Sequence, residues 1–129
     1  MMNIHESAED YLEAILRLKL EKGYSRSVDI STMLGVSKPS VSFAMKRFRE
    51  NGYIEMDDDS LITLTDKGME IAERIYERHR VLSMLLEDIG VSPEQAREDA
   101  CKIEHDISDE TFGMLKQVCA RLEAKKAEQ

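Results

Sequence analysis

The sequence predicts a mainly α-helical protein, in which a winged helix-turn-helix comes first and further helices follow. Three observations point to this fold class. Apolar residues recur at helical spacing in several segments of the 129-residue chain. A short helical segment, a glycine turn and a second segment with a capping serine follow one another around Gly35. Two short β-like runs come directly after them and flank a turn-rich stretch.

The helix-turn-helix is expected after a first helix over about residues 7–22, for which Ser7 is the predicted N-cap and Gly23 the stop. A helix over 27–34 should turn Val28, Ile30 and Leu34 inward. Ser37 then caps the second helix of the motif, which ends at residues 51–52. Its expected apolar stripe consists of Val41, Ala44, Met45 and Phe48.

A wing and three helices are expected in the rest of the chain. The runs 53–56 and 61–64 flank Asp57, Asp58 and Asp59 and read as a hairpin, although a plain loop is the alternative. Helices are expected over about 66–88, from a capping box at 92–95 to about 107, and from about 108–110 to 122. The last residues should fray.

The amino-acid composition is typical of a globular protein without a membrane span. Hydrophobic residues make up 42% and charged residues 34%, which is ordinary for a soluble, helix-rich chain. No apolar run is long enough for a membrane span, and the acidic N-terminus lacks a signal-peptide pattern, so we expect a cytoplasmic protein without a membrane partner. The two cysteines form no disulfide framework.

The charge is unevenly distributed. The net charge is −8, but residues 22–52 hold six basic and two acidic side chains, which gives +4 there and −12 elsewhere. A basic module on an acidic chain suits binding to DNA. The alternative is that these charges only solvate helix faces.

The second helix of such a motif enters the DNA major groove, so its first residues should meet bases and phosphates. Phe43 is an outward position that could contact a thymine methyl, or else the neighbouring helix. The candidate DNA-binding residues are Arg26, Ser37, Lys38, Pro39, Ser40, Ser42, Phe43, Lys46 and Arg47.

A second signal is the spacing of Cys101, Glu104 and His105, which would place a thiol, a carboxylate and an imidazole on one face of a helix. Asp10 and Glu13 are a second pair at helical spacing. Taken singly, Cys101 could be a small core residue and Glu104-His105 a polar face. His79 could likewise be a buried core histidine. His5 and Cys119 have no partner at ligand spacing and are assigned structural roles.

Together these residues resemble the diphtheria-toxin-repressor and manganese-repressor (DtxR/MntR) family of metal-dependent regulators. The resemblance covers almost the whole chain and is carried by AEDYLEAI, KGYSRSVDISTMLGVSKPSVS, NGYI, LITLTDKG, ERHRVLSMLLEDIGV and EDACKIEHDIS. It implies a DNA-binding domain over 1–65 and a helical metal-binding and dimerisation domain over 66–129. It also implies a homodimer on double-stranded, palindromic operator DNA, with metal as corepressor.

Carried over by position, the family's metal ligands fall on Asp10, Cys101, Glu104 and His105, and the manganese branch adds Glu13 and His79. The set is a hybrid, because Asp10 resembles the manganese branch and Cys101 the iron branch. The ancillary site of the iron branch would fall on Ser83 and Arg97, so it looks absent or altered. There is no room for the SH3-like domain that many iron-type members carry.

The thiolate is a softer ligand than a carboxylate, so the expected cofactor is a divalent transition metal, with Fe²⁺ favoured over Mn²⁺ and Zn²⁺ or Co²⁺ binding in vitro. We expect a repressor of iron or manganese homeostasis genes and not an enzyme, because the sequence shows no nucleophile motif and no phosphate-binding loop. The alternatives are a metal-independent winged-helix regulator and a small metalloenzyme.

Overall fold

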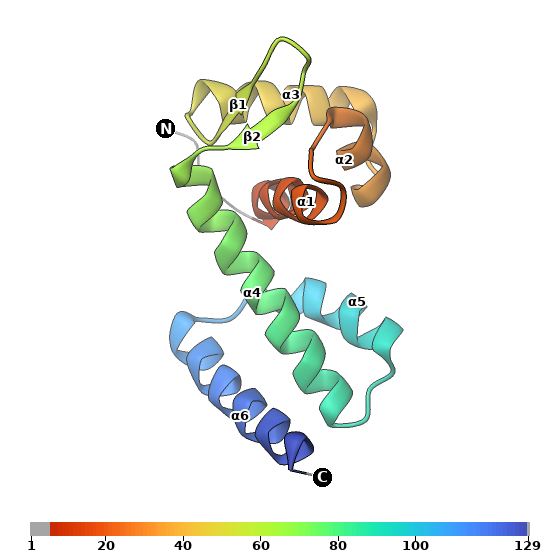
Figure 1. Cartoon of the computed structure of the whole chain (residues 1–129), viewed down its shortest axis with the longest axis vertical. Helices are drawn as coiled ribbons and strands as arrows, with labels where there is room; N and C mark the ends of the chain where they lie inside the picture. Colours follow the sequence, from red (N-terminus) through yellow and green to blue (C-terminus); the bar gives the residue numbers. More distant parts are fainter. Residues whose placement is uncertain (1–5, 129) are drawn as a thin grey trace. The chain divides into compact units, whose positions relative to one another are not determined.

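The computed structural model describes residues 6–128, which form six helices and one two-stranded hairpin (Figure 1). This confirms the predicted fold class. The elements are α1 (Glu6–Lys22), α2 (Ser27–Leu34), α3 (Lys38–Glu50), β1 (Ile54–Met56), β2 (Ile62–Leu64), α4 (Asp66–Asp88), α5 (Pro93–Ile103) and α6 (Asp109–Ala127).

Contacts divide the chain into two compact units, one up to Ile75 and one from Tyr76 onward. This division falls within α4, ten residues after the expected domain boundary at residue 65. The reason is that the first residues of α4 pack with the helix-turn-helix and hairpin. Gly68, for example, lies directly against the backbone of Tyr53.

The core of the N-terminal unit forms where α1 packs against the two helices of the motif. Leu12, Ile15, Ile30 and Val41 are all buried there. The ring of Phe48 meets those of Tyr11 and Tyr53 edge to face, at centroid distances of 6.1 and 6.3 Å. Aromatic rings prefer such an arrangement because of their charge distribution.

Local signals set the turn of the motif. Gly35 adopts φ 66° at the end of α2, a left-handed conformation that suits glycine. Ser37 caps α3 by accepting a hydrogen bond from the backbone of Ser40. Two details of the prediction are wrong. Ser7 lies inside α1 and is not its N-cap, and the side chain of Val28 is 49% exposed.

The predicted wing is an antiparallel hairpin in which Ile54 pairs with Leu64 and Met56 with Ile62. Its β2 strand is tied to the segment before α2, because Ile62 donates a backbone hydrogen bond to the carbonyl of Ser25 at 2.9 Å. The hairpin therefore has a fixed attachment to the base of the helix-turn-helix.

In the C-terminal unit, the second half of α4 lies between α5 and α6 (Figure 1). Val81, Phe112 and Cys119 form a buried cluster between α4 and α6. On α5, Ala96 and Ala100 are fully buried, and such small side chains let two helices approach closely. None of the described helices is long and apolar enough to cross a membrane.

Two helix ends differ from the prediction. Helix α5 stops at Ile103, not at about residue 107, and a turn follows. Helix α6 continues to Ala127, so residues 124–127 do not fray as expected. Contacts with α4 accompany both helix ends. Arg78 donates to the turn after α5, and Asp88 pairs with Lys126 near the end of α6.

Candidate functional site

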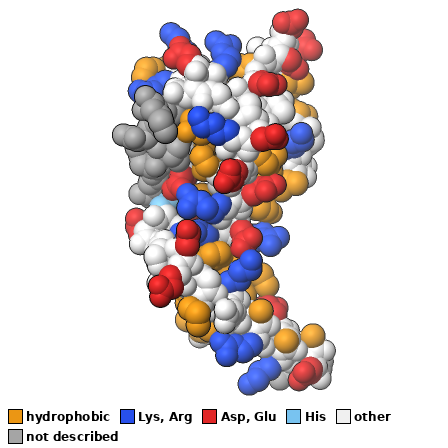
Figure 2. All heavy atoms as spheres, turned by 90° about the vertical axis from the view of Figure 1, so that its left-hand side faces the viewer, with side chains coloured by type: hydrophobic (Ala, Val, Ile, Leu, Met, Phe, Trp, Pro, Cys, Tyr) orange, Lys and Arg blue, Asp and Glu red, His pale blue; other side chains and the backbone are white. Residues whose placement is uncertain are grey.

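The predicted DNA-binding residues are all exposed to solvent on α3 and at the starts of α2 and α3. On α3, helical spacing turns Val41, Met45 and Phe48 inward, so the polar positions between them face solvent. Figure 2 shows basic and acidic side chains side by side on the surface of this unit. The exposed positions are Arg26, Ser37, Lys38, Pro39, Ser40, Ser42, Phe43, Lys46 and Arg47.

Two exposed aromatic rings in this region lie close to arginine. The side chain of Phe43 is 64% exposed, and the guanidinium of Arg47 lies 5.8 Å from its ring centroid. Arg26 lies 5.6 Å from the ring centroid of Tyr24 in the same way. Tyr24 was not among the predicted DNA-binding residues. An aromatic residue two positions before a basic one was the sequence signal that could have pointed to it. The exposure of Phe43 leaves its ring available for a DNA base.

The acidic tip of the wing has a structural role for one of its residues. The carboxylate of Asp57 accepts backbone hydrogen bonds from Asp59 and Leu61, both at 2.9 Å. Aspartate favours turns because it can make such bonds to the residues that follow. Asp57 therefore closes the hairpin, although all three aspartates are exposed at its tip.

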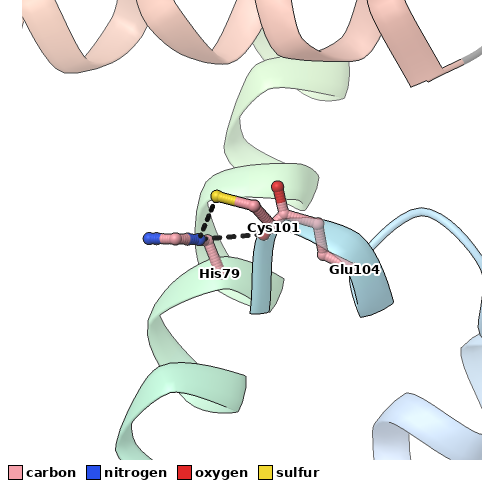
Figure 3. A group of neighbouring side chains, drawn as sticks. All are labelled: His79, Cys101 and Glu104. Atoms are coloured by element: carbon pink, nitrogen blue, oxygen red, sulfur yellow. Dashed lines mark hydrogen bonds and ion pairs between the residues drawn. The ribbon is translucent and has the colours of Figure 1, made fainter. Parts of the chain in front are cut away.

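The C-terminal unit brings three predicted metal ligands together (Figure 3). His79 comes from α4, Cys101 from α5 and Glu104 from the end of α5. The His79 Nδ1 atom lies 3.0 Å from Glu104 Oε2 and 3.7 Å from Cys101 Sγ. One ligand atom of each residue lies within 4.8 Å of those of the other two. Two helices thus contribute nitrogen, sulfur and oxygen to one point.

His105 lies next to this group but not on the helix. Glu104 caps α5, and His105 belongs to the turn that follows, so the expectation of one helical face for all three residues is wrong for His105. Its Nε2 atom lies 3.4 Å from Glu104 Oε1. The two oxygens of Glu104 therefore face two different histidines.

The neighbours of His79 favour its charged form. Hydrogen bonds to Cys101 and then to Glu104 raise the pKa of His79 to about 10. An imidazolium ring stabilises adjacent acidic groups, and the raised pKa reflects this mutual attraction. At neutral pH the ring of His79 therefore carries a proton and a positive charge beside Cys101 and Glu104.

The donor set fits a divalent transition metal. Imidazole, thiolate and carboxylate are the three side-chain types that bind Zn²⁺ and Fe²⁺. Glu104 is fully buried, and among the described residues its Oε1 atom makes the long ion-pair contact with His105 but no hydrogen bond. A buried carboxylate oxygen without a hydrogen bond is costly, and a bound cation would reduce that cost.

The remaining two predicted ligands lie in the N-terminal unit. Asp10 and Glu13 are one turn apart on α1, where Asp10 is half-buried and Glu13 buried. Residues three apart on a helix share a face, so the two carboxylates can act together. His5 lies outside the described residues.

Arg78 is a positioning residue that the sequence analysis missed. Its buried guanidinium donates to the carbonyl of Glu104 at 3.1 Å and to that of Ile107 at 2.8 Å. It also pairs with Asp109 and lies over the ring of Phe112. Arg78 thereby holds the turn that carries Glu104 and His105. An arginine directly before a histidine gives no recognisable signal of such a role in a single sequence.

The structural role assigned to Cys119 is incomplete, because the residue does have partners at ligand spacing. Glu123 follows it by one turn on α6, and Asp88 of α4 lies beside both. Elsewhere in this unit, Ser83 and Arg97 line a pocket of about 420 Å³ together with His79 and Arg80. Neither Ser83 nor Arg97 offers a carboxylate or an imidazole there.

Sequence profiles of two domains match the chain. The N-terminal DNA-binding domain of iron-dependent repressors matches residues 3–60, and their metal-binding and dimerisation domain matches residues 65–127. The chain is similar to the transcriptional regulator MntR of Salmonella typhimurium, with 42% identity over 83% of this chain and 68% of that protein. An uncharacterised HTH-type transcriptional regulator of Methanocaldococcus jannaschii is 34% identical over 86% of this chain and 90% of its own length.

Solved structures agree with these matches. IdeR of T. acidophilum superposes with a TM-score of 0.77 and 31% identity over 91% of this chain and 55% of its own. The manganese regulator SloR superposes with a TM-score of 0.74 and 26% identity, over 91% of this chain and 54% of its own. The chain thus spans about half the length of these two structures. On these grounds the chain belongs to the DtxR/MntR family of metal-dependent transcriptional regulators.

Proposed function

We propose that the protein is a homodimeric repressor of iron or manganese homeostasis genes, which binds a palindromic operator when it holds a divalent metal ion. The observation that carries this proposal is the convergence of His79, Cys101 and Glu104 in a unit that matches a metal-binding and dimerisation domain. The proposed ligands are Asp10, Glu13, His79, Cys101, Glu104 and His105. The bound ion would neutralise their negative charge.

The residues of the chain have distinct roles in this proposal. Glu104 offers an oxygen to each of two histidines, and Arg78 fixes the turn that carries it. Asp10 and Glu13 lie on the helix that packs against the helix-turn-helix, so metal bound to them acts on the DNA-binding unit. Metal binding would favour the DNA-binding conformation, because the six side chains would bind the ion most tightly in that conformation.

On the DNA side, the exposed face of α3 is proposed to enter the major groove. Ser37, Ser40 and the helix N-terminus would meet phosphate, whereas Phe43 would meet a base. Arg26, Lys46 and Arg47 would supply positive charge for contacts with the DNA phosphates, which provide much of the affinity in such interfaces. Two copies of α3 in a dimer would read two half-sites about one turn of DNA apart.

Fe²⁺ is the metal that we propose as corepressor, because the thiolate of Cys101 is a softer ligand than a carboxylate. Mn²⁺ is the second candidate. It is favoured by the three carboxylates Asp10, Glu13 and Glu104, and by the similarity to SloR and to a manganese-dependent repressor solved with manganese. The named relatives are regulators, which supports a regulatory and not an enzymatic role.

The test is an anaerobic operator-binding titration with Fe²⁺ and with Mn²⁺, on a duplex selected from randomised DNA. We expect Fe²⁺ to stimulate binding at a lower free concentration than Mn²⁺. Glu104→Ala and His105→Ala should lose the stimulation and keep their circular dichroism spectra. Glu98→Gln, an exposed carboxylate on the same helix, is the matched control and should respond as the wild type does.

The other outcomes are equally informative. Stimulation by Mn²⁺ at the lower concentration would favour the second candidate. Tight operator binding that neither metal changes would overturn the proposal and favour a metal-independent regulator. Full stimulation of Glu104→Ala would remove Glu104 from the ligand set.

A further inference from the structure

A second group of metal-ligating side chains lies between α4 and α6. Asp88 is the last residue of α4, and Cys119 and Glu123 lie four residues apart on α6. Helical residues at this spacing share a face. One ligand atom from each of the three side chains lies within 4.8 Å of those of the other two.

This group is separate from the one around Cys101. His79 and Asp88 are nine residues apart on α4, which at 3.6 residues per turn places them on opposite sides of the helix and roughly 13 Å apart along its axis. His79 faces α5 and Asp88 faces α6, and these two helices lie on opposite sides of α4 (Figure 1). The two groups therefore share no ligand.

The carboxylate of Asp88 is buried, but only one of its two oxygens has a partner among the described residues. Its side chain is only 3% exposed. The Oδ1 atom pairs with Lys126, whereas the Oδ2 atom is buried and has no hydrogen-bond partner among residues 6–128. The thiol of Cys119 is also buried. An unsatisfied, buried carboxylate oxygen is costly, and a cation at this point would compensate it.

The charges of the group also favour a bound cation. Among residues 6–128, the two carboxylates of this group pair with one ammonium, since Lys126 Nζ contacts Asp88 and also lies 3.8 Å from Glu123 Oε1. Like charges this close repel unless a cation lies between them. Lys126 partly fills that role, and a divalent ion would fill it more completely.

We propose that Asp88, Cys119 and Glu123 form a second metal site, for a divalent ion of the Zn²⁺ class that accepts both sulfur and oxygen ligands. Three protein ligands leave a fourth position for water. Such a site ties the end of α6 to the end of α4, and Lys126 competes with the ion for Asp88. This inference goes beyond the proposed function, because it uses none of the ligands assigned there.

Cobalt tests the site, because a thiolate bound to Co²⁺ absorbs in the near ultraviolet. The full chain with Cys101→Ser keeps Cys119 as its one thiol, so we titrate that variant with Co²⁺ in the absence of DNA. We expect the charge-transfer band to appear, and to be lost in Cys101→Ser/Cys119→Ser. On the Cys101→Ser background, Asp88→Asn and Glu123→Gln should each bind about tenfold more weakly or worse.

Two further variants on the same background sharpen the result. Lys126→Met removes the competing ammonium and should bind Co²⁺ more tightly. Glu110→Gln, an exposed carboxylate at the start of α6, is the matched control and should bind with unchanged affinity. If Cys101→Ser/Cys119→Ser fails to fold, Glu123→Gln still tests the site. Glu123 is half-buried, so its replacement by glutamine should leave the fold intact.

The proposal is overturned if Cys101→Ser shows no thiolate–cobalt band. It is also overturned if Asp88→Asn and Glu123→Gln leave the affinity unchanged. Failure here is distinguishable from failure of the proposed function, which is measured by the response of operator binding to metal in the otherwise unaltered chain.

Discussion

Arg78 donates through a single nitrogen, Nη1, to the backbone carbonyls of Glu104 and Ile107, at 3.1 and 2.8 Å. The guanidinium therefore links α4 to both ends of the turn between α5 and α6. A planar group with fixed donors on separate nitrogens can serve two carbonyls and a carboxylate in different directions, whereas a lysine carries its three donors on one nitrogen.

Replacing Arg78 should weaken both the fold and the ligand group. Arg78→Lys loses the forked geometry and weakens the hydrogen bonds to the Glu104 and Ile107 carbonyls, so the free energy of unfolding should fall by about 2 kcal/mol. Metal affinity should fall as well, because the turn that carries Glu104 is no longer held. Urea denaturation and metal titration measure the two effects. Arg80→Lys, two residues further on and exposed, is the control, and an equal loss there would contradict the role of Arg78.

Gly68 is predicted to be essential for packing at the start of α4. A Cβ atom there would lie 2.1 Å from the backbone oxygen of Tyr53, which already accepts a hydrogen bond from Thr65. Gly68→Ala should therefore lower the free energy of unfolding by about 2 kcal/mol or more, as overpacking does. Gly113→Ala on α6 has open space around its Cβ and should raise stability by up to about 1 kcal/mol. Thermal unfolding of both variants checks the contrast.

The helix-turn-helix and hairpin could be predicted because their signals are local. Gly35, Ser37 and the hairpin runs each act within a few residues of themselves. The error at Val28 was avoidable, because Val28 and Ile30 lie two positions apart and point about 200° apart on a helix. Only one of the two could face the core, and it is Ile30.

Features that depend on distant residues could not be predicted. The end of α5 is accompanied by the hydrogen bond from Arg78 to Glu104, and the extension of α6 by the pair of Lys126 with Asp88, 38 residues away. Within the candidate site, the spacing of Cys101 and Glu104 was visible in the sequence, whereas the place of His79 came from the family resemblance. The partner of Cys119 on α4 gave no sequence signal at all.

Metal affinity should rise with pH. The pKa of His79 is raised to about 10 by Cys101 and Glu104, so the ring carries a proton at neutral pH that metal must displace. Acid favours the protonated ring and weakens metal binding, and each proton released makes affinity rise tenfold per pH unit below that pKa. Calorimetric titrations between pH 6 and 8, in buffers of different ionisation enthalpy, count the protons.

In His79→Gln, one proton fewer should be released on metal binding, and the pH dependence should become shallower. The variant keeps a polar side chain of similar size, so the comparison isolates the titrating ring. An affinity of the unaltered protein that does not change between pH 6 and 8 would contradict the assignment of His79 as a ligand.

On the DNA-binding side, Arg47 and Phe43 are expected to differ in the kind of affinity they supply. Arg47→Ala removes an exposed charge, so binding should weaken by a similar factor for all sequences, and the slope of log affinity against log salt should fall by about 0.9. Phe43→Ala should leave that slope unchanged and relax the preference at one base pair, which is worth about 1–3 kcal/mol for a direct contact.

Both variants should fold normally, since Phe43 is 64% exposed and lies away from the core. Titrations of the selected operator and of single-base variants, each at several salt concentrations, separate the two effects. Arg121→Ala, an exposed arginine on α6, is the control for loss of charge alone. If it lowers the salt slope as much as Arg47→Ala does, the effect is one of net charge, and the exposed face of α3 does not form the contact with the DNA backbone.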